Sequence, residues 1–422
     1  DTIRNIENIT GGSAADTLTG DGLTNIIKGG AGNDILDGGA GIDTLDYSGS
    51  STSVIAVLNG TVFSSVTLTG IEDDTVRNFE NLVGGTASDT LIGDSFANVL
   101  TGNSGNDLLI GSLGNDTLSG CAGNDTLEGG TGSDTADYAD KTTAVIVTLN
   151  GSTNATVKVG GVAEDTVRNI ENVTSGSVAD TLTGDSLANT LIGNAGNDVL
   201  NGMSGNDFLR GGVGKDTLDG GIGTDTADYS DKTSAVAVVL NSSTSANVSV
   251  GGVAEDTIKN IENVTGGSAA DSLTGDSLAN SLIGNAGNDA LNGMSGNDFL
   301  RGGLGNDTLT GGAGQDTFRF DTILNGLTNV DRITDFVVAD DTIQLENSIF
   351  TKFGLSTTGA INSAYFKANI TGLAADNNDY IIYETDTGKL FYDADGNGVG
   401  ASVQIALLGT NLTLTSSDFV LV

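Results

Sequence analysis

The sequence predicts an all-β solenoid, in which short parallel strands stack in coils. Aspartates recur every nine residues, glycines precede each of them, and an apolar residue follows each two positions later. In the last such run they are Asp271, Asp289, Asp298, Asp307 and Asp316, with Asn280 in the one gap of the series. A glycine-rich turn followed by a strand of about three residues fits this pattern. Two nonapeptides therefore make one coil with a turn on each edge.

The same register appears in three earlier runs, which implies that the coils are stacked in tandem. The members of these runs are Asp180, Asn189, Asp198, Asp207, Asp216 and Asp225; then Asp89, Asn98, Asp107, Asp116, Asp125 and Asp134; then Asp16, Asn25, Asp34 and Asp43.

The repeats divide the chain. Units begin at Asp1, Asp74, Asp165 and Asp256, where DTIRNIENI and its variants recur, and the first unit is shorter than the next two by one coil. We expect four blocks with their spacers, and then a β-rich tail in which the nine-residue period is lost. The predicted segments are 1–73, 74–164, 165–255, 256–316 and 317–422, and we call the first four the first to fourth blocks.

The repeated aspartates are candidate metal ligands. Aspartates one coil apart would lie on the same edge at about the inter-strand spacing of ~4.8 Å, where their carboxylates repel. A hard cation held by carboxylates and backbone carbonyls relieves that repulsion. Calcium accepts six to eight oxygens in loose geometry, whereas zinc favours histidine and cysteine. The predicted ligands are Asp34, Asp43, Asp107, Asp116, Asp125, Asp134, Asp198, Asp207, Asp216, Asp225, Asp289, Asp298, Asp307 and Asp316, with Gly30, Gly32, Gly212, Gly214, Gly303 and Gly305 in the turns.

These G-G-x-G-x-D-x-L-x repeats resemble the repeats-in-toxin (RTX) family of bacterial secreted proteins. The resemblance implies a right-handed parallel β-roll that is unfolded at low calcium, folds outside the cell, and is exported by a type I secretion apparatus. The tail, which ends in Asp418, Phe419, Val420, Leu421 and Val422, is similar to the C-terminal cap and secretion signal of serralysin-type proteins.

Composition limits the function. The net charge of -39 and a pI near 4.1 argue against binding of nucleic acid or anionic membranes. The sequence contains no 18-residue apolar run and no signal-peptide pattern. It has no histidine, which excludes Ser-His-Asp and Cys-His catalysis, and we expect no enzymatic activity. Cys121, the single cysteine, fits a small residue at a turn.

The spacers and the tail contain further features. Ala235–Leu240 and Ala246–Val250 predict strands that continue the solenoid without calcium. The pairs Arg168/Glu171 and Lys259/Glu262 favour a solvated charge ladder over a site. Tyr47, Tyr138 and Tyr229 favour caps on the ends of the runs over a carbohydrate-stacking platform. Asp393–Gly398 resembles the start of an EF-hand loop but has Gln404 at the twelfth position, which favours a hairpin turn.

Two main functions stay open at this point, and a soluble calcium buffer is a third. The first is an extracellular structural protein, such as a surface-layer, adhesin or matrix component, since four blocks exceed what a secretion tail needs. The second is the folding and secretion module of a larger secreted enzyme or toxin, because GGVAE precedes Asp165 and Asp256 but nothing precedes Asp1. Self-association and a cell-surface polysaccharide are further candidate partners. Either function places the protein outside the cell or on its surface.

Overall fold

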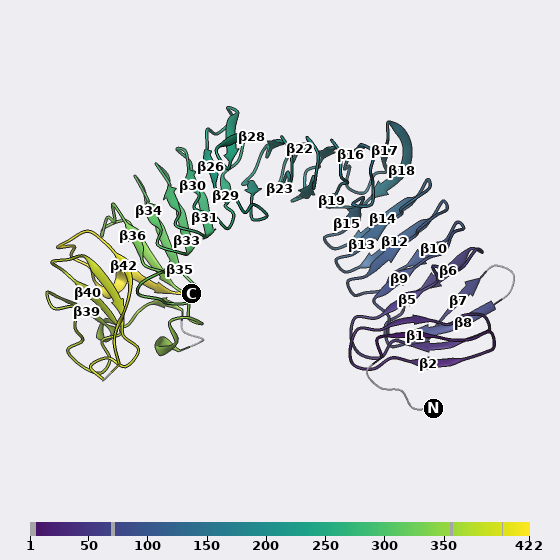
Figure 1. Ribbon diagram of the computed structural model, residues 1–422, viewed down its shortest axis with the longest axis horizontal. Coiled ribbons are helices and arrows are strands. Elements are labelled where there is room, and N and C mark those ends of the chain that lie inside the picture. The colour runs from purple at the N-terminus through teal and green to yellow at the C-terminus, as the bar shows by residue number, and fades with distance from the viewer. Residues whose placement is uncertain (1–5, 69–71, 355–357, 399) are drawn as a thin grey trace. The chain divides into compact units, whose positions relative to one another are not determined.

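The computed structural model describes residues 6–68, 72–354, 358–398 and 400–422. The chain divides into two compact units, Asp1–Asp216 and Thr217–Val422. Both units consist of short strands in two facing sheets, which we call sheet A and sheet B (Figure 1). The unit start at Asp1 lies outside the described residues.

Sheet A of the first unit contains parallel strands that pair with the next coil. Asn8 lies opposite Ile26, and Val99 lies opposite Thr117, so within a run of repeats the register advances by one predicted coil at each step. These strands are β1 (Asn8–Thr10), β3 (Ile26–Lys28), β5 (Thr44–Asp46), β9 (Asn81–Val83), β11 (Val99–Thr101), β13 (Thr117–Ser119), β15 (Thr135–Asp137), β19 (Asn172–Thr174), β21 (Thr190–Ile192) and β23 (Phe208–Arg210).

Sheet B of the first unit combines such parallel strands with two antiparallel insertions. The parallel strands are β2 (Thr17–Thr19), β4 (Ile35–Asp37), β10 (Thr90–Ile92), β12 (Leu108–Leu113), β14 (Thr126–Thr131), β20 (Thr181–Thr183) and β22 (Val199–Asn201). The insertions are the spacers, which form β6 (Val54–Val57), β7 (Ser64–Leu68) and β8 (Glu72–Arg77), and then β16 (Val145–Thr148), β17 (Ala155–Val159) and β18 (Val162–Arg168).

Each spacer keeps the solenoid continuous. Strand β18 pairs in parallel with β14, β17 pairs antiparallel with both β18 and β16, and β16 pairs in parallel with β20. Sheet A passes the same point directly from β15 to β19. The predicted continuation of the roll through the spacers is therefore confirmed, and each spacer adds strands to sheet B alone.

The second unit repeats this arrangement and ends in the tail. Its sheet A contains β25 (Thr226–Asp228), β29 (Asn263–Thr265), β31 (Ser281–Ala286), β33 (Phe299–Leu304), β35 (Thr317–Phe320), β37 (Thr342–Leu345), β38 (Gly359–Ala360) and β43 (Phe419–Leu421). Its sheet B contains β24 (Thr217–Asp219), β26 (Val236–Val239), β27 (Ala246–Val250), β28 (Val253–Lys259), β30 (Ser272–Thr274), β32 (Ala290–Asn292), β34 (Thr308–Thr310), β36 (Asp331–Ile333), β39 (Phe366–Asn369), β40 (Ile381–Glu384), β41 (Lys389–Tyr392) and β42 (Val403–Leu407). Three short 3-10 helices, η1 (Thr351–Phe353), η2 (Ser363–Tyr365) and η3 (Ser416–Asp418), lie in the tail.

The core of the roll is thin. In the repeats, the middle residue of each three-residue strand points inward, and Leu36, Leu109, Leu200 and Leu309 have no exposed surface. Its neighbours on the same strand face outward, as the two-residue periodicity of a strand requires. The structure confirms the predicted all-β parallel β-roll with a β-rich C-terminal cap, whereas the division into five segments stays a prediction.

Candidate metal-binding edges of the roll

The repeat aspartates form two columns, one along each edge. The B column contains the aspartates that precede sheet B strands, and the A column contains those that precede sheet A strands. In each column the Oδ1 atom of one aspartate accepts the backbone N–H of the aspartate one coil earlier. Asp107 N lies 2.8 Å from Asp125 Oδ1, and Asp289 N lies 2.8 Å from Asp307 Oδ1. The predicted ligands therefore stack as the spacing required.

The second carboxylate oxygen of these aspartates is buried without a hydrogen-bond donor. Leaving a charged oxygen in this state costs free energy, which a cation would recover. Among the described residues, the Oδ2 atoms concerned include those of Asp34, Asp43, Asp107, Asp116, Asp125, Asp134, Asp289, Asp298, Asp307 and Asp316. The other four predicted ligands are equally buried, and they are Asp198, Asp207, Asp216 and Asp225.

The turn glycines bring backbone carbonyls to the same edges. Gly305 has a φ of 142°, and a Cβ there would lie 1.5 Å from the carbonyl oxygen of Gly287, one coil earlier. The other predicted turn glycines also have positive φ and face a carbonyl or backbone of the preceding coil, and they are Gly30, Gly32, Gly212, Gly214 and Gly303. Within the described ranges, no three Asp, Glu or Cys side chains cluster to hold a metal. A cation on a column would therefore take carbonyl as well as carboxylate oxygens, which suits calcium.

A family model identifies the repeats that form these columns. The RTX calcium-binding nonapeptide repeat model, which spans four copies of the repeat, matches residues 10–45, 83–118, 101–136, 174–209, 192–227, 265–300 and 283–318. The chain belongs to the RTX family. Its repeats bind calcium, as proteins with these repeats do, and such proteins are typically secreted and extracellular.

Comparison with curated sequences and with solved structures adds no further argument. No curated protein sequence matches the chain. Among solved structures, a similar chain is the extracellular lipase LipA from Serratia marcescens, with 16% sequence identity and a TM-score of 0.22. The match covers 63% of this chain and 45% of the lipase chain, so the RTX chain spans less than half of the length of that lipase.

Burial makes the column carboxylates weak acids. It raises the pKa of Asp107, Asp116, Asp125 and Asp298 to about 6, although the N–H donated by the preceding coil opposes the shift. For Asp289, burial and the neighbouring carboxylates of Asp307 and Asp271 raise the pKa to about 7. The metal-free columns therefore bind protons more tightly than ordinary carboxylates do, and calcium competes with protons for the same oxygens.

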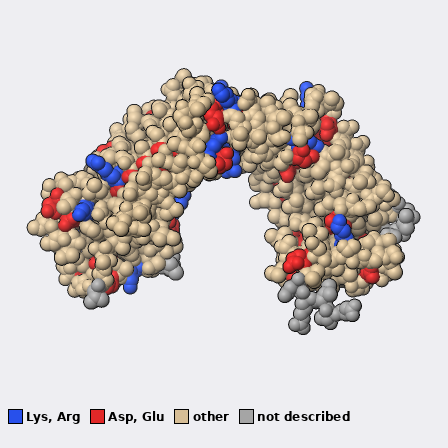
Figure 2. Space-filling model, in the orientation of Figure 1, with Lys and Arg blue, Asp and Glu red and all other residues tan. Residues whose placement is uncertain are grey.

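Figure 2 shows the consequence for the surface, where Asp and Glu form only scattered patches on the visible face despite the net charge of -39. Much of the acidity lies inside the columns.

The ends of the columns contain acidic residues that the repeat pattern does not reveal. Asp125 N donates to Asp165 Oδ1 at 2.7 Å, and Asp34 N donates to Asp74 Oδ1 at 2.8 Å, so these spacer residues close the B columns. Glu171 and Glu262 close the A columns, because each accepts the N–H of the last repeat aspartate at 2.9 Å. Reading both glutamates as part of a solvated ladder was therefore wrong.

The basic partners assigned to that ladder do lie on the surface. Lys259 pairs with Asp219 at 2.7 Å and Arg168 pairs with Glu128, with about 40% of each basic side chain exposed. The prediction of a solvated ladder is correct for these two residues. Exposed pairs of this kind stabilise a fold little.

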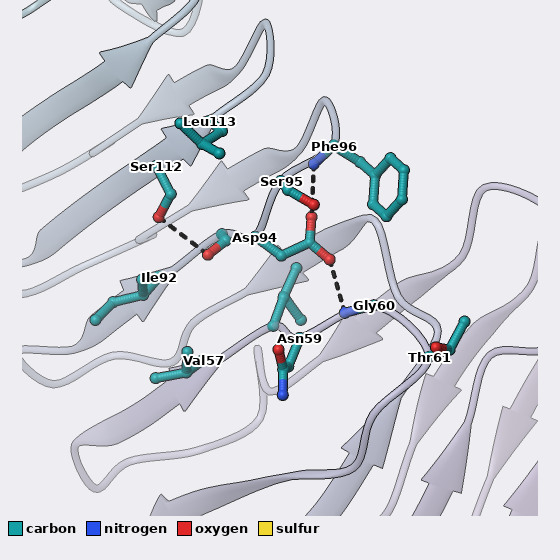
Figure 3. A pocket seen from close by; sticks show the side chains of 12 residues that line it. Val57, Asn59, Gly60, Thr61, Ile92, Asp94, Ser95, Phe96, Ser112 and Leu113 are labelled. Atoms are coloured by element: carbon teal, nitrogen blue, oxygen red, sulfur yellow. Dashed lines mark hydrogen bonds between the residues drawn. The ribbon is translucent and has the colours of Figure 1, made fainter.

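The beginning of each A column is closed by side chains in place of a metal. Figure 3 shows Asp94, which stands where the repeat would have a glycine, with Oδ1 accepting Phe96 N at 2.9 Å and Oδ2 accepting Gly60 N at 2.8 Å. Asn98 accepts Asp94 N through Oδ1 and donates through Nδ2 to the carbonyl of Glu80. Both Asp94 oxygens are engaged by backbone donors, so Asp94 and Asn98 cap the start of this A column.

Tyrosines lie buried where the blocks end. Tyr47 donates its hydroxyl to Asp74 Oδ2 at 2.8 Å, and Tyr138 and Tyr229 are each 1% exposed. These rings are inaccessible to a carbohydrate, and the predicted capping role is correct.

Two further turns agree with their predictions. The Asp393–Gly398 segment joins the antiparallel strands β41 and β42 as a hairpin turn, in which Asp393 Oδ1 accepts Asp395 N at 3.2 Å. Cys121 occupies a glycine position of its repeat with a φ of 64°, as a small residue at a turn.

Proposed function

We propose that this RTX chain is an extracellular structural protein whose rolls fold when calcium binds outside the cell. The observation that carries the proposal is the series of buried Oδ2 atoms without a donor along both edges. The thin apolar core cannot offset an ordering entropy of ~1–2 kcal/mol per residue, so metal binding and folding are coupled.

Calcium would supply the positive charge that the stacked carboxylates lack, in the range of ~10⁻⁴–10⁻³ M that is typical of extracellular modules. Aspartates of adjacent coils, together with the carbonyls of the turns, would hold it. In the cytosol, where calcium is scarce, 55 acidic residues would keep the chain expanded and suited to export by a type I secretion apparatus. The described residues include no helix that is long and apolar enough to cross a membrane.

The structural role rests on the extent of the array. RTX repeats recur in four stretches from residue 10 to residue 318. We propose that the chain itself performs no catalysis, because it lacks histidine and its buried carboxylates belong to the columns. The partners proposed for a surface layer, adhesin or matrix component are further copies of this chain and a cell-surface polysaccharide.

Electron microscopy of the purified protein in millimolar calcium, and again after addition of EGTA, tests the structural role. Ordered sheets or filaments that dissolve on chelation are expected. Monodisperse particles at all concentrations would contradict the structural role and favour the alternative, in which this chain folds and exports a larger type I-secreted enzyme or toxin.

A further inference from the structure

A lysine lies buried at the end of the B column in the second block. Lys141 is 8% exposed, and its Nζ donates to the backbone carbonyl of Cys121. The same Nζ lies 3.4 Å from Asp140 Oδ2 and 3.8 Å from Glu164 Oε1. A buried ammonium is stable only with partners of opposite charge, and here a carbonyl and two carboxylates surround it.

The position of Lys141 in the stack explains these contacts. Cys121 stands at the second glycine position of the repeat that ends in Asp125, the last repeat aspartate of this B column. The next turn along the edge is Tyr138–Lys141, which is closed by Lys141 N donating to Tyr138 O at 2.9 Å. This turn contains no G-x-G-x-D sequence. It therefore contributes an ammonium beside the last repeat turn, while Asp165 from the spacer contributes the carboxylate that a further repeat would supply.

The charge of Lys141 also reaches the column itself. Burial raises the pKa of Asp125 to about 6 and that of Asp165 to about 7, and the positive charge of Lys141 acts against both shifts. Lys141 also lines a pocket of about 320 Å³, together with Glu164 from strand β18 and Asn106, Gly123 and Asn124 from the repeat turns. The pocket thus joins the last repeat turn to the spacer.

We propose that Lys141 is a tethered cation, which takes the place of a calcium ion at the last step of this column. With it, the block can close on its spacer without a further metal ion. The inference deepens the proposed calcium-dependent folding and rests on it.

Lys232 in the next spacer repeats the arrangement. It is 8% exposed, its N–H donates to Tyr229 O at 2.9 Å, and its Nζ lies 2.5 Å from Glu255 Oε1.

The first block differs, because a serine stands in place of the lysine in the equivalent turn. Ser50 closes that turn with its backbone N–H 2.8 Å from Tyr47 O. A pocket of about 390 Å³ lies beside Ser50 and Gly30, and Lys28, which also lines it, pairs with Asp46 at 2.8 Å.

The test is a calcium titration of the full chain, followed by circular dichroism. Lys141→Met removes the charge and keeps the length of the side chain, whereas Lys141→Arg keeps the charge. Lys158→Met removes the same charge from an exposed position on β17 of the same spacer. We expect the folding midpoint in calcium to rise roughly threefold for Lys141→Met, since removing one partner of a buried pair leaves the other uncompensated. Lys141→Arg and Lys158→Met should stay near the wild-type midpoint.

The double variant Lys141→Met/Glu164→Gln separates charge compensation from packing. In the Lys141→Met background, neutralising Glu164 should bring the raised calcium midpoint part of the way back to the wild-type value. If the single variant fails to fold, the double variant should fold again. A Lys141→Met midpoint equal to that of Lys158→Met, or a double variant no better than the single one, would overturn the inference. If calcium leaves the wild-type spectrum unchanged, calcium-dependent folding itself is wrong.

Discussion

The fourth block and the C-terminal cap stabilise the same two sheets in different ways. The block contributes one inward leucine per strand, such as Leu291, Leu300 and Leu309, and buries carboxylates between its coils. The cap instead contains a cluster of aromatic rings, in which Phe353 lies 5.7 Å from Tyr365 and 5.9 Å from Tyr380 between ring centroids. A region with aromatic burial can fold by the hydrophobic effect, whereas a column of carboxylates needs a counter-charge.

Replacing a turn glycine should have the largest effect. In Gly305→Ala the new Cβ would lie 1.5 Å from the carbonyl oxygen of Gly287. Because Gly305 also has a positive φ, which alanine adopts only with strain, we expect the free energy of unfolding to fall by about 3 kcal/mol or more. Gly409→Ala in the cap is the matched control, because its Cβ would make an ordinary 3.6 Å contact with Leu412. Urea unfolding in saturating calcium would measure both, and equal effects would show that the turn is not closely stacked.

Truncating an aromatic ring should destabilise the cap and leave the repeats intact. Phe353→Ala removes a side chain that is 7% exposed, and such truncations cost about 3–5 kcal/mol. Hydrogen exchange should therefore accelerate in residues 358–398 and stay slow in residues 265–318. Faster exchange in both regions would mean that block and cap unfold as one unit.

Neutralising a column carboxylate should weaken calcium binding without unfolding the calcium-loaded protein. In the wild-type protein Asp289 Oδ1 accepts Asp271 N at 2.7 Å. Asp289→Asn keeps an oxygen that can accept this N–H but removes the charge. We expect the calcium midpoint to rise several-fold, because ligand charge sets the affinity of such sites. Asp386→Asn, at an exposed position in the cap, should leave the midpoint unchanged. A shift of similar size in both variants would point to net charge alone.

The smallest expected effect is the pH dependence of the metal-free protein, which should distinguish the repeat columns from the C-terminal cap. Burial raises the folded-state pKa of Asp289 to about 7 and of Asp298 to about 6, above the usual value of about 4. Folded columns thus bind more protons than unfolded ones. Their stability is fully present below about pH 4 and is lost as pH rises through 6–7.

Circular dichroism of calcium-free protein should therefore show more β-structure at pH 4.5 than at pH 7.5, and at pH 5.5 more calcium should be needed than at pH 7.5. A β-sheet signal that increases with pH in the absence of calcium would contradict this linkage.

The sequence predicted the repeating part of the site and missed its ends for a physical reason. The link between Asp107 and Asp125 spans 18 residues, the length of one coil, and so it is visible as a period. The link between Asp125 and Asp165 spans 40 residues, because a three-stranded insertion lies between them. Lys141 was missed for the same reason, since a turn without a repeat motif carries no signal until it is stacked on its neighbour.

The most direct test of calcium-dependent columns is hydrogen exchange of the whole chain with calcium and with EGTA. Residues 265–318 should lose their protection on chelation, while residues 358–398 of the aromatic cap keep a larger share of theirs. Protection of the repeats that is unchanged by EGTA would contradict the account, because it would show that the buried carboxylates are stable without a metal ion.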